Sequence, residues 1–127
     1  ACIGGYIPQL LLKEKYDRAD KAAEYFKGLH VDKVFLATAG INIDTGLTYP
    51  SMSDLVVKKA MIEAADKVYL VADSTKIGKS SFATLGSLAM LDYIITDSNI
   101  SQEDCKLFNK YNLKYIISPI KEESNDF

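Results

Sequence analysis

The sequence predicts an α/β domain, Rossmann-like, in which a mostly parallel sheet is flanked by helices. Three nearly continuous apolar runs, at residues 34–39, 68–72 and 93–97, are typical of strands that are buried on both faces. Stretches with the apolar spacing of amphipathic helices separate these runs. Strands that alternate with helices of about 10–15 residues form right-handed βαβ units, and such units build a parallel sheet.

The first elements are a short strand and a helix. Residues 1–7 form a β-like run that the pair Gly4-Gly5 interrupts, which indicates a bulge or a close approach at a sheet edge. Asp17 or Asp20 can cap the helix that follows. Its apolar stripe consists of Ala19, Ala22, Ala23, Phe26 and Leu29.

Two further helices and a last strand complete the pattern. Ser51 and Asp54 have the spacing of a capping box, and the apolar stripe behind them is Val57, Ala60, Met61, Ala64 and Ala65. The pair Lys58-Lys59 is expected on the solvated face of this helix. Residues 101–104 begin the third helix, with Cys105, Phe108 and Tyr111 on one side, and 114–118 is the last strand. Residues 40–50 and 74–81 are rich in turn formers and are expected to be loops.

Length and composition favour one domain with a real core. The chain has 127 residues, of which 48% are hydrophobic, and its net charge of −2 lacks the basic excess of a nucleic-acid-binding module. No apolar run approaches the ~20 residues of a membrane span, and no secretory signal opens the chain. We therefore expect a cytoplasmic protein with two free thiols, no metal site and no cofactor. Because the first residue is Ala, we expect a piece of a larger protein.

Polar residues follow three of the predicted strands, where ligands bind in parallel sheets. Residues 73–79 are the most informative, because Asp73 ends a strand, Lys76 follows three residues later and Gly78 permits an unusual backbone turn. A lysine can neutralise a phosphate there, and an aspartate can accept hydrogen bonds from sugar hydroxyls. The same two residues fit an enzyme's lysine and general base, or a surface turn in which they merely pair.

Other motifs are weaker. The loop at 40–46 does not match the dinucleotide-binding fingerprint, and the chain has no Walker lysine motif. His30 follows a predicted helix end, where it is expected to cap the helix rather than catalyse a reaction. The eight tyrosines are spread widely and suggest no stacking platform.

Four ordered motifs closely resemble the C-terminal sensor domain of DeoR-type transcriptional repressors. They are Asp-Lys-Val-Phe-Leu-Ala-Thr-Ala-Gly-Ile at 32–41 with Gly-Leu-Thr at 46–48, Val-Lys-Lys-Ala-Met-Ile-Glu-Ala-Ala at 57–65, Val-Ala-Asp-Ser-Thr-Lys-Ile-Gly at 71–78, and Ile-Ile-Thr-Asp at 94–97. Together with Gly4-Gly5 they cover about residues 3–118. Among these repressors, the chain resembles those of lactose phosphotransferase systems in its overall look.

The resemblance implies a fold and a role. The fold is that of ribose-5-phosphate isomerase, glucosamine-6-phosphate deaminase and CoA transferases, and the role is to bind a phosphorylated sugar that changes operator affinity. Residues 1–120 are then the C-terminal part of the sensor domain, and 121–127 are a polar tail. The family's helix-turn-helix and its first βα units, which carry a phosphate loop, are missing here, so operator DNA would be contacted only by that missing part. The resemblance also implies a homo-oligomer without enzymatic activity.

The resemblance implies that the effector-binding residues are those at the matching motif positions, which are Thr38, Gly40, Asp44, Asp73 and Lys76. Lys76 is expected to meet the anionic group, and Asp73 to hold sugar hydroxyls and orient Lys76. Thr38 and the Gly40 backbone would line the floor of the pocket, with Asp44 at its rim, and Asp97 is a further candidate. The alternative is a sugar-phosphate isomerase or amino-sugar deaminase of the same superfamily, with Asp73 and Lys76 as its base and cation.

Overall fold

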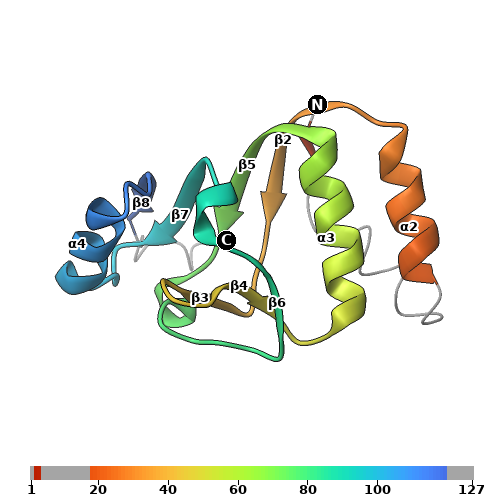
Figure 1. Cartoon of the computed structure of the whole chain (residues 1–127). Coiled ribbons are helices and arrows are strands. Elements are labelled where there is room, and N and C mark those ends of the chain that lie inside the picture. The colour runs from red at the N-terminus through yellow and green to blue at the C-terminus, as the bar shows by residue number, and fades with distance from the viewer. Residues whose placement is uncertain (1, 4–17, 120–127) are drawn as a thin grey trace, which may run out of the picture.

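The computed structural model describes residues 2–3 and 18–119, and these form two sheets and three α-helices (Figure 1). The larger sheet is parallel and has the strand order β1-β2-β5-β7-β8, and the smaller one is antiparallel with the order β3-β4-β6. The strands of the larger sheet are Cys2–Ile3, Val31–Leu36, Ala65–Val71, Tyr93–Asp97 and Tyr115–Ser118. The strands of the smaller sheet are Gly40–Asn42, Gly46–Tyr49 and Ala83–Gly86. The helices are α2 (Arg18–Lys27), α3 (Met52–Ala64) and α4 (Gln102–Lys110). The predicted α/β class with a mostly parallel sheet is confirmed.

Helices α3 and α4 begin where the sequence predicts. The Ser51 hydroxyl donates to Asp54 Oδ2 at 2.9 Å and accepts from the Asp54 N–H at 3.4 Å, so the capping pair stabilises the first turn of α3. Ser101 accepts from the Asp104 N–H at 3.1 Å at the start of α4. Helix α2 ends at Lys27, so Leu29, expected in its stripe, lies beyond the helix and is 39% exposed.

The expected loop at 40–50 is correct only for the turn at 43–45, because the residues on both sides of this turn are strands. Strands β3 and β4 form a hairpin there, and Gly46 takes the left-handed φ of +92° that few other residues adopt. Strand β6, which the sequence analysis did not predict, pairs with β4. These strands have only three or four residues, too few for a clear alternation of apolar and polar side chains.

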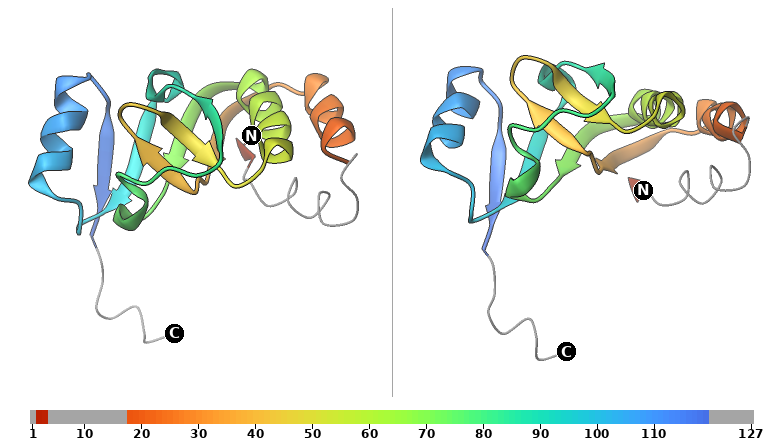
Figure 2. Two further views of the ribbon diagram at one scale, coloured as in Figure 1. Left: turned by 60° about the horizontal axis from the view of Figure 1, so that its bottom comes forward. Right: turned by 90° about the horizontal axis from the view of Figure 1, so that it is seen from below.

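One hydrophobic core lies between the parallel sheet, α3 and the smaller sheet (Figure 2). Its fully buried members include Val34, Leu36, Leu70, Ile94, Val57, Met61 and Leu47. The prediction that the strands are buried on both faces is wrong for the described residues. Buried and more exposed side chains alternate along β2, β5 and β7, which is typical of a sheet with one covered face.

Several expectations fall outside the described residues. The glycine pair Gly4-Gly5, the cap Asp17 and the polar tail at 121–127 are in this group. No helix in the described ranges is both long enough and apolar enough to cross a membrane.

Candidate functional site

Four of the candidate residues lie where strands of the parallel sheet end at their carboxyl side, whereas Gly40 and Asp44 belong to the β3–β4 hairpin (Figure 1). Thr38 follows β2, Asp73 and Lys76 follow β5, and Asp97 is the last residue of β7. Strands β2, β5 and β7 are neighbours in the sheet. The topology therefore gathers these residues along one edge, as the rule for open parallel sheets requires.

Asp73 begins a short 3-10 turn, Ser74–Lys76, and holds it by its carboxylate. Asp73 Oδ1 accepts from the Thr75 N–H at 2.9 Å and also from the Thr75 hydroxyl. The Thr75 hydroxyl, followed by the Thr75 N–H and the nearby charge of Lys76, holds the pKa of Asp73 below its ordinary value. Asp73 is exposed and Lys76 is half-buried, so this turn presents a fixed carboxylate next to an ammonium.

Asp97 ties the end of β7 to the same turn. Its Oδ2 accepts from the Ser74 N–H at 2.9 Å, and its Oδ1 accepts from the Asn99 N–H at 2.9 Å. The bond from Ser74 is the largest cause that lowers the pKa of Asp97. Asp97 thus positions the turn that carries Lys76, a role that the sequence did not predict for it.

Thr38 and Gly40 lie inside a hydrogen-bonded cluster at the end of β2. The Thr38 hydroxyl lies 2.9 Å from the Thr48 carbonyl and 3.1 Å from the Gly40 carbonyl, and it donates to these oxygens. The Tyr49 hydroxyl donates to the Ala37 carbonyl, and burial raises the pKa of Tyr49. Gly40 is buried, and a Cβ built there would lie 2.3 Å from the Lys79 carbonyl oxygen. Only glycine permits this close approach of the two backbones.

Several contacts join the loop after β5 to the smaller sheet. The Gly78 N–H donates to the Ile41 carbonyl at 2.7 Å, next to the bridge between Ile41 and Ile77. The Ser81 N–H donates to the buried Thr48 hydroxyl at 2.8 Å. The loop that carries Lys76 is therefore held at its start by Asp97 and at its end by β3 and β4.

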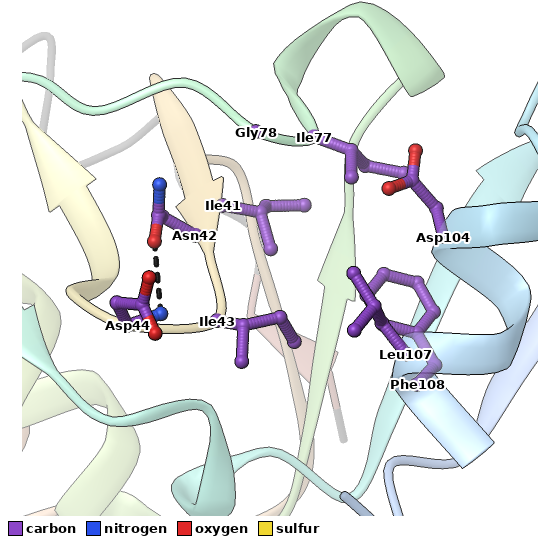
Figure 3. Close-up of a pocket in the computed structure, with 9 residues that line it drawn as sticks. All are labelled: Ile41, Asn42, Ile43, Asp44, Ile77, Gly78, Asp104, Leu107 and Phe108. Carbon is purple, nitrogen blue, oxygen red and sulfur yellow. Dashed lines mark hydrogen bonds between the residues drawn. The ribbon is translucent and has the colours of Figure 1, made fainter. Parts of the chain in front are cut away.

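A cavity of about 190 Å³ opens beside this junction (Figure 3). Its walls come from the β3–β4 hairpin, the loop after β5 and α4, and they consist of Ile41, Asn42, Ile43, Asp44, Ile77, Gly78, Asp104, Leu107 and Phe108. Asp44 is the only candidate among the lining residues, and its N–H donates to Asn42 Oδ1 at 2.8 Å. Asp104 lies across from it on α4 (Figure 3). The cavity is thus apolar inside and carries two carboxylates among its lining residues.

Lys58 is a buried residue that the sequence analysis placed wrongly. It is 2% exposed rather than solvated, whereas Lys59 is exposed as expected. Its ammonium has no hydrogen-bond partner among the described residues and lies 5.9 Å from the centre of the Tyr49 ring. Burial lowers the pKa of Lys58, and the charge of Asp54 opposes this shift. The helical spacing already indicated this position, because Lys58 lies three residues before the buried Met61 and four residues after Asp54, on the same side of α3.

His30 has a carboxylate partner, and the described residues contain no metal-ligand cluster. His30 Nε2 bonds to Asp66 Oδ1 at 2.8 Å on the surface, which raises the pKa of His30. The histidine thus pairs with a residue of β5 instead of capping α2, as the sequence had suggested. No cluster of three or more His, Cys, Asp or Glu side chains suited to a metal occurs among residues 2–3 and 18–119.

Comparison with known proteins identifies relatives among transcriptional regulators. The HTH-type transcriptional regulator GlpR of Haloferax volcanii is 35% identical over 82 residues, which cover 65% of this chain and 32% of the relative. The HTH-type transcriptional repressor GlcR of Bacillus subtilis is 31% identical over 103 residues, 81% of this chain and 39% of the relative. The HTH-type regulator YulB of Bacillus subtilis is 29% identical over 119 residues, 94% of this chain and 45% of the relative. The chain thus spans between a third and a half of the length of these relatives.

The family model of the DeoR C-terminal sensor domain matches residues 13–98. This range contains the turn with Asp73 and Lys76, the cluster of Thr38 and Gly40, and Asp97 at the end of β7. The resemblance stated from the four motifs is thereby confirmed, while the closer likeness to lactose-system repressors stays a prediction. The chain belongs to the family of DeoR-type transcriptional regulators, and the match lies in their C-terminal sensor domain.

Proposed function

We propose that the chain is the effector-sensing part of a repressor of carbohydrate metabolism, and that it binds a phosphorylated sugar at the carboxyl edge of the parallel sheet. One observation supports this proposal above all. The turn that carries Asp73 and Lys76 is fixed at this edge by Asp97 and by the backbone of β3, so its charged groups have a defined position before any ligand arrives.

Each charged residue of the turn suits one part of such a ligand. The Lys76 ammonium supplies a point charge for the phosphate. Asp73 and Asp97 have lowered pKa values, so both are carboxylates at neutral pH and can accept hydrogen bonds from sugar hydroxyls. Asp73 also lies close enough to Lys76 to feel its charge, which supports the proposed role of orienting it.

The remaining candidates supply shape. The Thr38 hydroxyl already bonds within the chain and Gly40 has no side chain, so both are proposed to form the floor of the pocket. Asp44 lines the neighbouring cavity, whose isoleucines suit the apolar face of a sugar ring. We infer the same superfamily as ribose-5-phosphate isomerase and glucosamine-6-phosphate deaminase, as the resemblance to the DeoR-type sensor domain implies.

The proposed mechanism of regulation is a shift between two states of the repressor. The effector changes operator affinity by its difference in affinity for the DNA-binding and the released state. We propose that a part of a longer protein outside this chain contacts the operator, because the relatives are named "HTH-type" regulators. The whole protein is proposed to act in the cytoplasm.

The enzyme alternative has less support. His30 precedes β2, at the amino side of the sheet and away from the candidate site. The relatives are named as transcriptional regulators or repressors. We therefore propose a binding function without catalysis.

Thermal unfolding with a panel of hexose and pentose phosphates and the matching free sugars tests the function. A ligand at 100 times its dissociation constant adds about 2.7 kcal/mol, which corresponds to a rise in Tm on the order of 10 °C for a domain of this size. We expect this rise with a phosphorylated sugar and not with its free form.

Two lysine variants form the matched pair for this test. Lys76→Met should abolish the rise, whereas Lys79→Met, which removes an exposed lysine from the same loop, should retain it. An equal rise with the free sugar, or a rise that Lys76→Met leaves intact, would contradict the proposed phosphate contact. If no compound of the panel raises the Tm, this result would contradict a sugar-phosphate site in this chain.

A further inference from the structure

Lys58 is a buried charged residue outside the set of candidate effector-binding residues. It lies in the second turn of α3, a helix that packs beside β4 and β6 (Figure 2). Its ammonium is buried without a hydrogen-bond partner among the described residues. The charge of Asp54, one turn earlier on the helix, acts on Lys58, but the Asp54 carboxylate already accepts from the Ser51 hydroxyl at 2.9 Å. The positive charge of Lys58 is therefore only partly balanced.

A charge in this position destabilises the fold. Water solvates an ammonium strongly, and an ammonium that enters the protein interior without a partner loses this solvation. The contact with the Tyr49 ring recovers only part of the loss. A methionine of similar length would fill the same space with no charge to desolvate, as the buried Met61 does on the same helix. Groups that cost stability are concentrated at functional sites, so Lys58 is a candidate for a functional residue.

Tyr49 connects Lys58 to the floor of the proposed pocket. The Lys58 Nζ lies 5.9 Å from the centre of the Tyr49 ring, and the Tyr49 hydroxyl donates to the Ala37 carbonyl. Burial raises the pKa of Tyr49, and a hydrogen bond with the Thr38 hydroxyl opposes this shift. Tyr49 is buried, whereas Ala37 is exposed just beyond the carboxyl end of β2. One side chain thus contacts both the buried ammonium and the edge of the sheet at which Thr38 lies.

The candidate residues alone give the proposed pocket too little positive charge. A phosphate monoester carries about 1.5 to 2 negative charges at neutral pH. Asp73 and Asp97 add two carboxylates at the same edge, where Lys76 is the one ammonium among the candidate residues. Lys79 is exposed, so water screens its charge. A buried ammonium below the floor acts more strongly at the same distance, because the protein interior screens charges less than water does.

We propose that Lys58 is the second cation of the effector site and attracts the phosphate of the ligand from beneath the pocket floor. This inference rests on the proposed function, because it assigns a further residue to the same pocket. Lys76 contacts the phosphate, and Lys58 acts on it through the field of its charge, which is held against the Tyr49 ring. The effect is reciprocal, because a bound phosphate balances the charge of Lys58. Lys58 therefore weakens the free protein and strengthens the complex.

Isothermal titration of the hexose and pentose phosphates into the wild type and Lys58→Met tests the inference, together with urea denaturation of each free protein. We expect Lys58→Met to weaken binding by about fivefold or more, because a positive charge in a medium of low dielectric is lost. The same free variant should unfold at a higher urea concentration than the wild type. Lys59→Met is the matched control, because Lys59 is exposed on the same helix, and it should leave both measurements unchanged.

Two further variants separate the charge of Lys58 from its shape. Lys58→Arg keeps the positive charge, so it should bind the phosphorylated sugar within about twofold of the wild type. Lys58→Gln removes the charge and keeps a polar side chain, so it should weaken binding as Lys58→Met does. If Lys58→Met loses its fold, Lys58→Gln takes its place in the titration.

Three results would overturn the inference. In the first, Lys58→Met and Lys58→Gln bind as tightly as the wild type while Lys76→Met does not bind, so the proposed function stands and only the role of Lys58 is lost. In the second, Lys58→Met weakens binding but also destabilises the free protein, which would assign Lys58 to the support of the fold. In the third, the wild type binds no compound of the panel, which would overturn the proposed function and this inference together.

Discussion

Thr48 shows how much one buried hydroxyl can hold together. It is 1% exposed, and it accepts from the Ser81 N–H and lies 3.4 Å from the Gly40 carbonyl. Thr48→Val keeps the shape of the side chain but leaves the Ser81 N–H without its partner. We expect a loss of about 1–3 kcal/mol in the free energy of unfolding, measured by urea denaturation.

The matched variant Thr48→Ser separates the hydroxyl from the methyl group. It retains the acceptor for Ser81, so it should recover most of the stability that Thr48→Val loses. Equal losses in the two variants would show that packing of the methyl group matters more than the hydrogen bond.

Lys58 poses the opposite case, a charge whose burial costs free energy. The effective penalty for burying an ion is several kcal/mol, whereas a cation–π contact such as that with Tyr49 returns about 2 kcal/mol. The penalty is the larger of the two. We therefore expect Lys58→Met to raise the free energy of unfolding at pH 7 by about 1 kcal/mol or more, measured by urea denaturation.

The pH dependence of stability gives a second measurement on Lys58. Its pKa is lowered in the folded state, so between that value and the unfolded value of about 10.4 the unfolded chain binds more protons. The contribution of Lys58 to stability therefore rises with pH across this window and is constant below it. The advantage of Lys58→Met should shrink as the pH rises towards 10, and Lys59→Met, at an exposed position, should show no such trend.

At the scale of elements, the junction between the smaller sheet and the loop after β5 depends on Gly40. In Gly40→Ala the new Cβ would lie 2.3 Å from the Lys79 carbonyl oxygen and 2.7 Å from its carbon, and backbone atoms cannot move aside cheaply. We expect a loss of about 1–3 kcal/mol by thermal or chemical unfolding. Gly28→Ala is the control, since a Cβ there meets nothing within 4 Å, and it should not destabilise the chain. A fully stable Gly40→Ala would show that the loop is free to shift.

The elements also show which structural signals the sequence carried. Capped helices such as α3, with Ser51 and Asp54, were predictable because their signals are local and chemical. The strand Tyr93–Asp97 was predictable from its apolar run. Strands β3, β4 and β6 were not, since each has too few side chains to show a period, and β6 pairs with a strand, β4, that is distant in sequence.

Some features of the candidate site were also predictable from the sequence, and others were not. The rule for strand ends correctly predicted that Asp73, Lys76 and Asp97 lie at one edge. Asp97 as the anchor of the Ser74 N–H was not predictable, because that contact joins two loops 23 residues apart. The burial of Lys58 depends equally on the packing of the completed fold around α3.

At the scale of the whole molecule, the error about strand burial has a topological cause. An apolar run such as Val68–Tyr69–Leu70–Val71 indicates that both faces of a strand are shielded from water. It does not indicate which part of a protein covers each face. The described elements of this chain cover one. The prediction of a strand from this apolar run was therefore correct. The prediction that elements of this chain cover both faces of the strand was wrong for the described residues.

The order of the parallel strands has a further consequence, for folding kinetics. Each strand of the larger sheet pairs with the parallel strand that precedes it in the chain, so no pairing in this sheet has to wait for a segment synthesised much later. Among parallel sheets, one that pairs only strands that follow each other in the chain has a lower entropy cost of loop closure than one that pairs strands further apart. The sheet can therefore grow strand by strand, from β2 towards β8, while the chain leaves the ribosome.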